Sequence, residues 1–480
     1  MKKLGENIWY SFLNSLTISI FGSIFWLILF KFLKLQDFGL ISYIFASSLL
    51  LINLFSFGTF QALWKYCSEN KFKKIFIFSL LFSAIGIFLI YLISFFYFNN
   101  LLIFYISLSL FVSTFLENIL FGFQEFKKIF LSNLFSSLSR LILIFLVYYF
   151  FGLKVELIAL VVILSTLIGI IFKFFYLKEY LFKNLFSNLN FNEVKRFLSL
   201  SFSSFLSSFS SFFYSNFLVV SSFIVFSSIL AGIIYFSQII FVIISFFPSI
   251  IISAALPLIS KLFVRGRVEK IKFIIKNLFV LSTIIIIPLS FLIAFHFETI
   301  LKIINFEDEI INSFTSSIFL VIAISSTFFL LSNILLSLLF SLSKVKEIYF
   351  TELFSILIFL VLFFISYKYE NIFYLLLGYF LVPIFKFLLY FYTLNINLSS
   401  IFSIKLSFLI IFSFLVSYYL KSEVLIFDVV LSLISLFLII FFIKTIKIFD
   451  SDFETFIKKL NLPDLVKKIA IKLFLKQIKL

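Results

Sequence analysis

Long apolar stretches, separated by short polar ones, fill the chain from end to end. A run of about 20 apolar residues is long enough to cross the hydrocarbon core of a bilayer. The pattern predicts fourteen such spans, at about 8–33, 40–64, 75–97, 101–121, 129–150, 155–177, 197–220, 229–258, 273–296, 311–340, 350–367, 372–393, 406–420 and 424–443. Because the connections are short, successive spans are expected to be antiparallel neighbours. The pattern therefore predicts an all-α membrane protein.

The seventh span has two different faces when it is drawn as a helix with 100° per residue. One face is bulky and apolar, with Phe202, Phe205, Leu206, Phe209, Phe212 and Phe213, and we expect it to meet lipid. The other carries Ser199, Ser203, Ser204, Ser207, Ser208, Ser210, Ser211 and Ser215. Small residues most often serve close helix packing, yet this row is longer than one packing seam needs. We interpret Ser203, Ser207, Ser210 and Ser211 as candidate substrate contacts in a hydrated cavity.

Composition and charge place the chain in a bilayer. Hydrophobic residues make up 63% of it and charged residues 13%, whereas a soluble protein is about half apolar and a quarter charged. The net charge of +17 does not indicate nucleic acid, because 32 Lys and Arg residues fall on one predicted side of the membrane and 6 on the other. The basic side faces the cytoplasm. We therefore predict a multi-pass protein of the cell (cytoplasmic) membrane with both termini in the cytoplasm.

A basic stretch at 178–196 separates six spans from the eight that follow. The second span, which opens near Gly39, resembles the eighth, which opens near Gly232. The two are six spans apart in the order of the chain and so run in the same direction, which means that duplicated halves would be parallel repeats. The predicted parts are an N-lobe at 1–177, a cytoplasmic linker at 178–196, a C-lobe at 197–393, two further helices at 406–443 and a basic amphipathic cytoplasmic tail at 444–480. Linker and tail are expected to contact anionic membrane lipids.

The signatures of enzymes are missing from the sequence. Catalysis needs ionisable groups that converge in a site, and the longest predicted outside connection has only about fourteen residues. There is no Gly-rich phosphate loop, no metal-ligand cluster and only one cysteine. The single histidine, His296, is expected to be incidental. We expect no enzymatic activity, no metal and no cofactor, which leaves transport.

Charged residues inside spans are costly, so they are candidates for function. Arg140 lies midway along the fifth span and shares a helical face with Asn133, Ser136 and Ser137. One interpretation pairs it with Glu117 of the preceding span, about 10 Å away in depth. The other, which we favour, makes Arg140 a cavity-facing cation that binds a phosphate-bearing substrate.

Other charged residues lie closer to span ends. The side chains of Lys173, Lys386, Glu352 and Asp428 are expected to reach the membrane interface. Glu117 and Asp428 are the weak candidates for ion coupling. Pro248 and Pro257 are predicted to let the eighth span bend.

Three segments resemble a known family. They are 27–66 with Asp37, Phe38 and Gly39; 121–143; and 197–271 with Gly232, Tyr235, Pro257 and Gly266. They resemble the polysaccharide (O-antigen-type) flippases of the multidrug/oligosaccharidyl-lipid/polysaccharide exporter superfamily. The chain departs from that pattern at Asn216, where the family often has an acidic residue.

The resemblance implies two pseudo-symmetric six-helix lobes around a central cavity, plus two C-terminal helices. It implies alternating access that moves a polyprenyl-(pyro)phosphate-linked oligosaccharide to the outer leaflet for cell-surface polysaccharide synthesis. Gating is expected at Gly39, Gly232, Pro248 and Pro257, and other polysaccharide-assembly proteins are candidate partners. Two alternatives stay open, which are a cation-coupled multidrug antiporter of the same superfamily and a membrane-embedded glycan assembly enzyme or scaffold.

Overall fold

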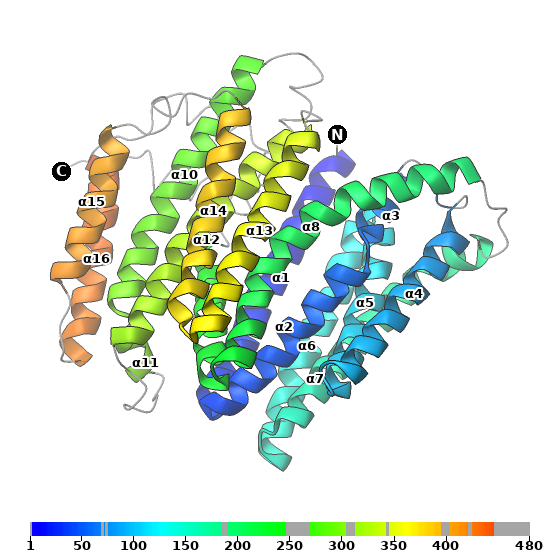
Figure 1. Cartoon of the computed structure of the whole chain (residues 1–480), viewed down its shortest axis with the longest axis horizontal. Coiled ribbons are helices and arrows are strands. Elements are labelled where there is room, and N and C mark those ends of the chain that lie inside the picture. The colour runs from blue at the N-terminus through cyan, green and yellow to red at the C-terminus, as the bar shows by residue number, and fades with distance from the viewer. Residues whose placement is uncertain are drawn as a thin grey trace. The chain divides into compact units, whose positions relative to one another are not determined.

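The fold was analysed in a computed structural model (Figure 1). The structure describes residues 2–68, 72, 75–184, 191–245, 268–303, 313–341, 345–394, 404–420 and 425–445. Within these residues the regular structure is helical and contains no strand. The predicted all-α class is therefore confirmed.

The described helices follow the apolar runs closely. Their bounds are α1 Lys2–Phe32, α2 Leu35–Phe55, α3 Thr59–Ser68, α4 Phe76–Phe96, α5 Leu101–Gly122, α6 Phe126–Phe151, α7 Val155–Asn184, α8 Phe191–Val225, α10 Val268–Phe295, α11 Phe297–Ile303, α12 Ser313–Ser341, α13 Val345–Tyr369, α14 Ile372–Thr393, α15 Ile404–Tyr419 and α16 Leu425–Thr445, with a further helix over Ser228–Ser245. In this part of the chain, eleven helices are long and apolar enough to cross a membrane. Every predicted span overlaps a described helix, while the full number that crosses the bilayer stays a prediction.

Polar side chains inside these apolar helices bond mostly to their own backbone. The hydroxyl of Ser42 donates to the carbonyl of Phe38 at 2.7 Å, and that of Ser107 donates to Ile103 at 2.6 Å. A hydroxyl satisfied in this way can sit in a water-free environment without leaving a donor unpaired. Outward positions carry bulky apolar residues, such as Phe88 at 59% and Phe202 at 61% exposure. This distribution is the one expected for helices in lipid.

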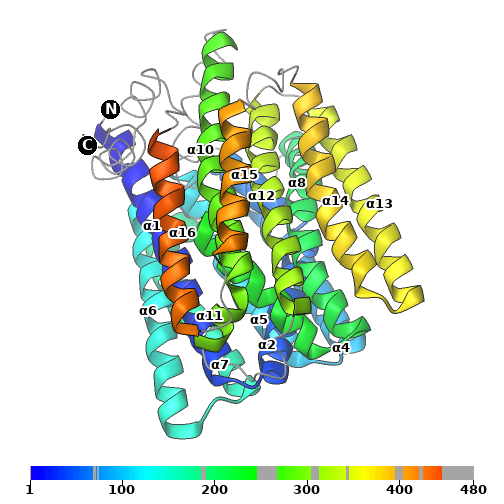
Figure 2. The same cartoon turned by 90° about the vertical axis from the view of Figure 1, so that its left-hand side faces the viewer.

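The helices group into two compact units, each described here by itself. One contains Met1–Phe236 and Glu352–Leu375, and the other contains Ser237–Thr351 and Leu376–Leu480. In the first, α1 packs along α6, α5 along α7 and α2 along α8. In the second, α10 packs against α12 and α15, and α16 packs against α10, α11 and α15 (Figure 2). The predicted lobes at 1–177 and 197–393 remain a prediction.

The expected single helix over 40–64 is wrong, because the chain breaks between α2 and α3. Phe57 and Gly58 both adopt positive φ, at 48° and 71°. A Cβ on Gly58 would lie 2.0 Å from the carbonyl oxygen of Ser201 in α8, so the break lets two backbones meet. Thr59 closes the turn by donating its hydroxyl to the Ser56 carbonyl at 2.7 Å. Only glycine combines this φ with such a close approach at no steric cost.

Two other boundaries differ from expectation. Helices α7 and α8 extend into the predicted linker from both sides, to Asn184 and from Phe191. The expected span over 273–296 ends at Phe295, and His296 forms a turn before α11. Residues 185–190 of the linker and 446–480 of the tail lie outside the described residues, so their placement on the membrane surface stays a prediction.

Candidate functional site

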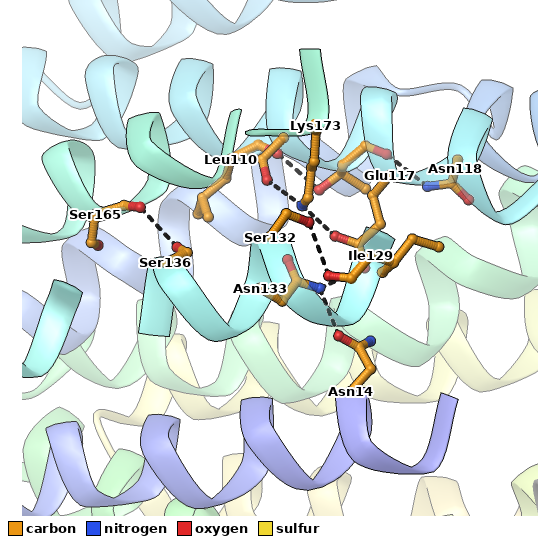
Figure 3. A network of polar contacts seen from close by, with 12 residues as sticks. Asn14, Leu110, Glu117, Asn118, Ile129, Ser132, Asn133, Ser136, Ser165 and Lys173 are labelled. Atoms are coloured by element: carbon orange, nitrogen blue, oxygen red, sulfur yellow. Dashed lines mark hydrogen bonds and ion pairs between the residues drawn. The ribbon is translucent and has the colours of Figure 1, made fainter. Parts of the chain in front are cut away.

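A largely buried ion pair lies at the centre of a polar network in the first unit (Figure 3). Lys173 of α7 is only 1% exposed. Its Nζ lies 2.5 Å from Glu117 Oε2 and donates to the hydroxyl of Ser113 at 2.9 Å, both on α5. The expectation that Lys173 reaches the interface is therefore wrong. A carboxylate partner inside the helix bundle makes burial of the ammonium group tolerable.

The network continues from Glu117 to two asparagines. Asn133 Nδ2 on α6 lies 3.2 Å from Glu117 Oε1 and 2.9 Å from Asn14 Oδ1 on α1, as Figure 3 shows. Four helices, α1, α5, α6 and α7, are thus joined by side-chain hydrogen bonds around one ion pair. Buried networks with satisfied partners make the arrangement of their helices more rigid.

Arg140 lies on α6 two turns beyond Asn133 and does not join this ion pair. Its Nε donates to the Ser165 hydroxyl of α7 at 3.1 Å, and its guanidinium carbon lies 5.6 Å from the centre of the Phe25 ring on α1. The alternative that pairs Arg140 with Glu117 is wrong, because Lys173 occupies that carboxylate. Among the described residues, no carboxylate lies within ion-pair distance of Arg140.

Aromatic residues lie on the side of Arg140 that faces α1 and the helix over Ser228–Ser245. Tyr235, in the helix over Ser228–Ser245, lies within electrostatic range of Arg140. The Tyr235 ring contacts Trp26 of α1 at a centroid distance of 4.7 Å, and Phe30 stacks on Phe236 at 3.6 Å. An arginine has five N–H donors in a fixed fork, and the Nε donor is the one that has a hydrogen-bond partner among the described residues. The half-buried fork is therefore able to bind an anion.

The serines of α6 differ in their surroundings. Ser136 donates to the Ser165 carbonyl at 2.8 Å, and its Cβ lies 3.1 Å from where a Cβ on Gly169 would be. Small residues at such a contact allow α6 and α7 to pack closely. Ser137 is half-buried on the same helix. The side chains of Ser203, Ser207, Ser210 and Ser211 lie outside the described residues, so the hydroxyl face of α8 stays a prediction.

Gly39 and Gly232, expected to be gating positions, meet each other. The Cα of Gly39 lies 3.3 Å from the position that a Cβ on Gly232 would take. A Cβ on Gly39 would lie 1.8 Å from the carbonyl oxygen of Ser228. The start of α2 and the start of the helix over Ser228–Ser245 are therefore in backbone contact. Sequence similarity singled out both glycines but did not reveal that they touch.

The structure describes two of the four prolines in the predicted spans, and it describes Asn216. Pro248 and Pro257 lie outside the described residues, so their gating role stays a prediction. Pro288 lies inside α10 and Pro383 inside α14. Asn216 of α8 is buried, at 8% exposure.

A second buried pair, in the other unit, was not expected from the sequence. Asp428 and Lys386 of this unit are 0% and 2% exposed, and Glu352 of the first unit is 1% exposed, so the expectation that these side chains reach the interface is wrong. Asp428 Oδ2 lies 2.9 Å from His296 Nδ1 and accepts a hydrogen bond from the hydroxyl of Thr299. His296 is therefore part of a defined contact and is not incidental. The partners are 132 residues apart, and no local pattern marks their pairing.

The chemistry available elsewhere in the described residues is limited. No group of three His, Cys, Asp or Glu residues gathers there as metal ligands would. Cys67 on α3 is buried, which raises the pKa of its thiol and favours the unreactive protonated form.

Comparison with known proteins gives a family and a fold. The profile of a family described as "Polysaccharide biosynthesis protein" matches residues 4–263. The curated proteins give no significant sequence match. The solved structure of the lipid II flippase MurJ in an inward closed conformation is similar, with a TM-score of 0.60 and 16% identity over 91% of this chain and 98% of that one.

Multidrug transporters share the same architecture. An inward-facing MATE family transporter of the MOP superfamily gives a TM-score of 0.58 with 13% identity, over 81% of this chain and 94% of that one. The eukaryotic MATE transporter AtDTX14 gives 0.54 with 11% identity, over 82% and 95%. At these identities the likeness establishes a common fold, and the choice of substrate depends on the residues of the site.

Proposed function

The chain belongs to the polysaccharide biosynthesis protein family, and on this basis we propose that it moves a polyprenyl-(pyro)phosphate-linked oligosaccharide from the inner to the outer leaflet of the cell membrane. The movement serves cell-surface polysaccharide synthesis and proceeds by alternating access. The fold shared with a lipid II flippase and with MATE transporters supports transport as the class of activity. No chemical step and no cofactor are part of this function.

The contrast between two cations inside predicted spans of the first unit, Lys173 and Arg140, carries the proposal. Lys173 is neutralised by Glu117 at 2.5 Å, whereas Arg140 has no carboxylate partner among the described residues. At 4 Å a pair of unit charges attracts by about 4 kcal/mol when the effective dielectric constant is near 20. Arginine also binds phosphate through two parallel N–H bonds. A pyrophosphate is therefore the ligand group that Arg140 suits best.

We assign gating to the contact between Gly39 and Gly232. In the predicted topology this contact lies at the outer end of α2, so it closes the outer side while the lipid-linked sugar enters from the cytoplasm. Separation of the two helices would then open the site outward. Serines of α8 would contact sugar or water, and the linker, the tail and other polysaccharide-assembly proteins would meet at the cytoplasmic face.

A cation-coupled multidrug antiporter is the second candidate function. The MATE likeness, the buried carboxylate of Asp428 and the partly buried carboxylate of Glu117 favour it. Against it, Glu117 already has Lys173 and Asn133 as partners. A drug site also gives no reason for an arginine without a carboxylate partner in the described interior, since the typical drug of such a transporter is itself cationic.

Reconstitution into lipid vesicles tests the proposal. The probe is a fluorescent polyprenyl pyrophosphate that carries a short oligosaccharide, and an impermeant quencher reports the fraction in the outer leaflet over time. We expect purified protein to speed the movement of this probe above that of protein-free vesicles. Ethidium, a cationic drug, is the comparison substrate. Movement of ethidium without movement of the lipid-linked probe would reject the flippase and favour the antiporter.

A further inference from the structure

The only histidine of the chain occupies an unusual place in the second unit. His296 forms the turn between α10 and α11 and is 2% exposed. Its Nδ1 lies 2.9 Å from Asp428 Oδ2, in the first turn of α16. Its other ring nitrogen, Nε2, is buried and has no hydrogen-bond partner among the described residues. A buried polar atom without a partner calls for an explanation.

The contact with Asp428 determines which nitrogen carries the proton. A carboxylate accepts hydrogen bonds, so Nδ1 of His296 is the protonated nitrogen that donates to it. Thr299 donates its hydroxyl to the same carboxylate oxygen. In neutral imidazole Nε2 is then a lone-pair acceptor. It is the atom of this cluster that is able to take up one more proton.

Phe295 and Phe297 flank His296 along the chain and pack against neighbouring helices, and few ionisable groups of the described residues come near the dyad. Phe297 stacks on Phe319 of α12 at 4.5 Å, and Phe295 contacts Phe414 of α15 at 5.4 Å. The titratable groups at this end of the neighbouring elements, in the described part of the chain, are Glu298 and Lys302 on α11, Tyr418 and Tyr419 on α15, and Asp428 itself on α16. Helix α12 has none, and the described basic residues of α10, ending at Lys276, lie about 30 Å away by helical rise.

We propose that His296 and Asp428 form a proton-binding site. Uptake of one proton at Nε2 converts neutral imidazole into imidazolium, and Asp428 stabilises that cation across the 2.9 Å contact. The chemistry balances without any other reactant, since the proton bonds to a lone pair and leaves by the same bond. Because the site joins α16 to the α10–α11 turn, its charge state affects how α16 packs there.

A transport role for this site rests on the proposed function. The charge pattern predicts that the α10–α11 turn and the start of α16 face the outside of the membrane. An energised membrane supplies protons from that side. Proton entry at His296 would then accompany outward movement of the lipid-linked substrate, and an inward pH gradient would drive the cycle.

Nuclear magnetic resonance of the ring nitrogens tests proton binding directly. Because the chain has one histidine, histidine labelled with ¹⁵N reports His296 alone in protein purified without a histidine tag. In lipid nanodiscs, across a series from about pH 5 to 8, we expect a neutral ring protonated on Nδ1 at the alkaline end and a doubly protonated ring at the acid end. A ring that keeps one protonation state throughout this range in folded protein would overturn the proposal.

Asp428→Asn provides the matched variant. Loss of the carboxylate should move the midpoint of the ring titration to lower pH, because an opposite charge at this distance favours imidazolium. An unchanged midpoint in the folded variant would remove Asp428 from the site. If this variant does not fold, the titration of the wild-type protein still decides whether His296 binds a proton.

Vesicle flipping under an imposed pH gradient tests the coupling. We expect an acidic outer side to speed the lipid-linked probe in wild-type protein and in Tyr419→Phe, an exposed tyrosine on α15 that serves as control. His296→Gln should lose this gradient dependence. Titration of the ring without any flipping would contradict the proposed function alone, whereas flipping without titration would contradict the proton site alone.

Discussion

The backbone contact at Gly39 allows a sharp test of gating. Replacement by alanine would place a methyl carbon 1.8 Å from the carbonyl oxygen of Ser228, whereas real Cβ contacts essentially never fall below 3.0 Å. The start of α2 must therefore move by at least the difference of 3.0 and 1.8 Å, which is 1.2 Å. Both contacting groups are backbone, so no side chain can rotate away. Overpacking of this kind costs about 1–3 kcal/mol.

That cost falls on the outward-closed state alone if the contact is a gate. A change of about 1–3 kcal/mol shifts a two-state equilibrium by roughly 5- to 150-fold. Two other glycine-to-alanine variants serve as controls for the size of this shift. A Cβ on Gly232 would lie 3.2 Å from the flexible end of Leu35 and 3.3 Å from the backbone of Gly39, and a shift of a few tenths of an ångström relieves both contacts, so Gly232→Ala should shift the equilibrium by less than about 5-fold. A Cβ on Gly22 of α1 meets no atom within 4 Å, so Gly22→Ala should have no effect.

Cysteine labelling measures the opening of the gate. Ser42, one turn further along α2, is fully buried in the closed contact, and the chain has only one natural cysteine, Cys67. In a Cys67→Ser, Ser42→Cys background, an impermeant maleimide added outside should label the Gly39→Ala protein roughly 5- to 150-fold faster than its parent. Labelling of a folded Gly39→Ala protein at the parental rate would refute the gate.

Two further predictions concern the polar network of the first unit. Lys173→Met should lower the free energy of unfolding by up to about 3–5 kcal/mol, because it leaves the carboxylate of Glu117, whose side chain is 19% exposed, without its cation. Lys173→Met with Glu117→Gln should restore most of this loss. Thermal unfolding in detergent measures both variants, and equal melting temperatures for the single and the double variant would contradict the ion pair. Asn133→Ala should lower the free energy of unfolding by about 1–3 kcal/mol, because Asn14 and Glu117 each lose a hydrogen-bond partner. Ser137→Ala, on the same helix, serves as a nearly neutral control. Equal losses of stability in the two variants would contradict the network.

The sequence predicted the helices well because a bilayer demands long apolar runs. Each predicted span overlaps a described helix, and the family resemblance agrees with the profile match. The break at Phe57 and Gly58 was missed, although Ser56 and Gly58 are residues that favour turns. It exists because α8 approaches Gly58, a tertiary contact that apolar periodicity does not record.

The side-chain pairs in the interior could not be predicted either, because each is a tertiary contact between residues far apart in the sequence. Lys173 and Glu117 are 56 residues apart, and His296 and Asp428 are 132 apart. Nearness to a span end suggested that Lys173 and Asp428 reach water. Burial became tolerable only because another helix supplies the opposite charge or a hydrogen bond. Arg140, by contrast, was recognisable from its position in the middle of a span.

Binding of a short-chain polyprenyl pyrophosphate to purified protein in nanodiscs tests the role of Arg140 most directly. A hydrogen bond to a charged group contributes about 1.5–3 kcal/mol, so Arg140→Gln should raise the Kd by roughly 10- to 150-fold. Arg140→Lys should lie between because it keeps the charge but loses the fork. Arg196→Gln, at an exposed position of α8, should bind like the wild-type protein. A folded Arg140→Gln protein with the wild-type Kd would contradict the proposal that Arg140 binds the pyrophosphate.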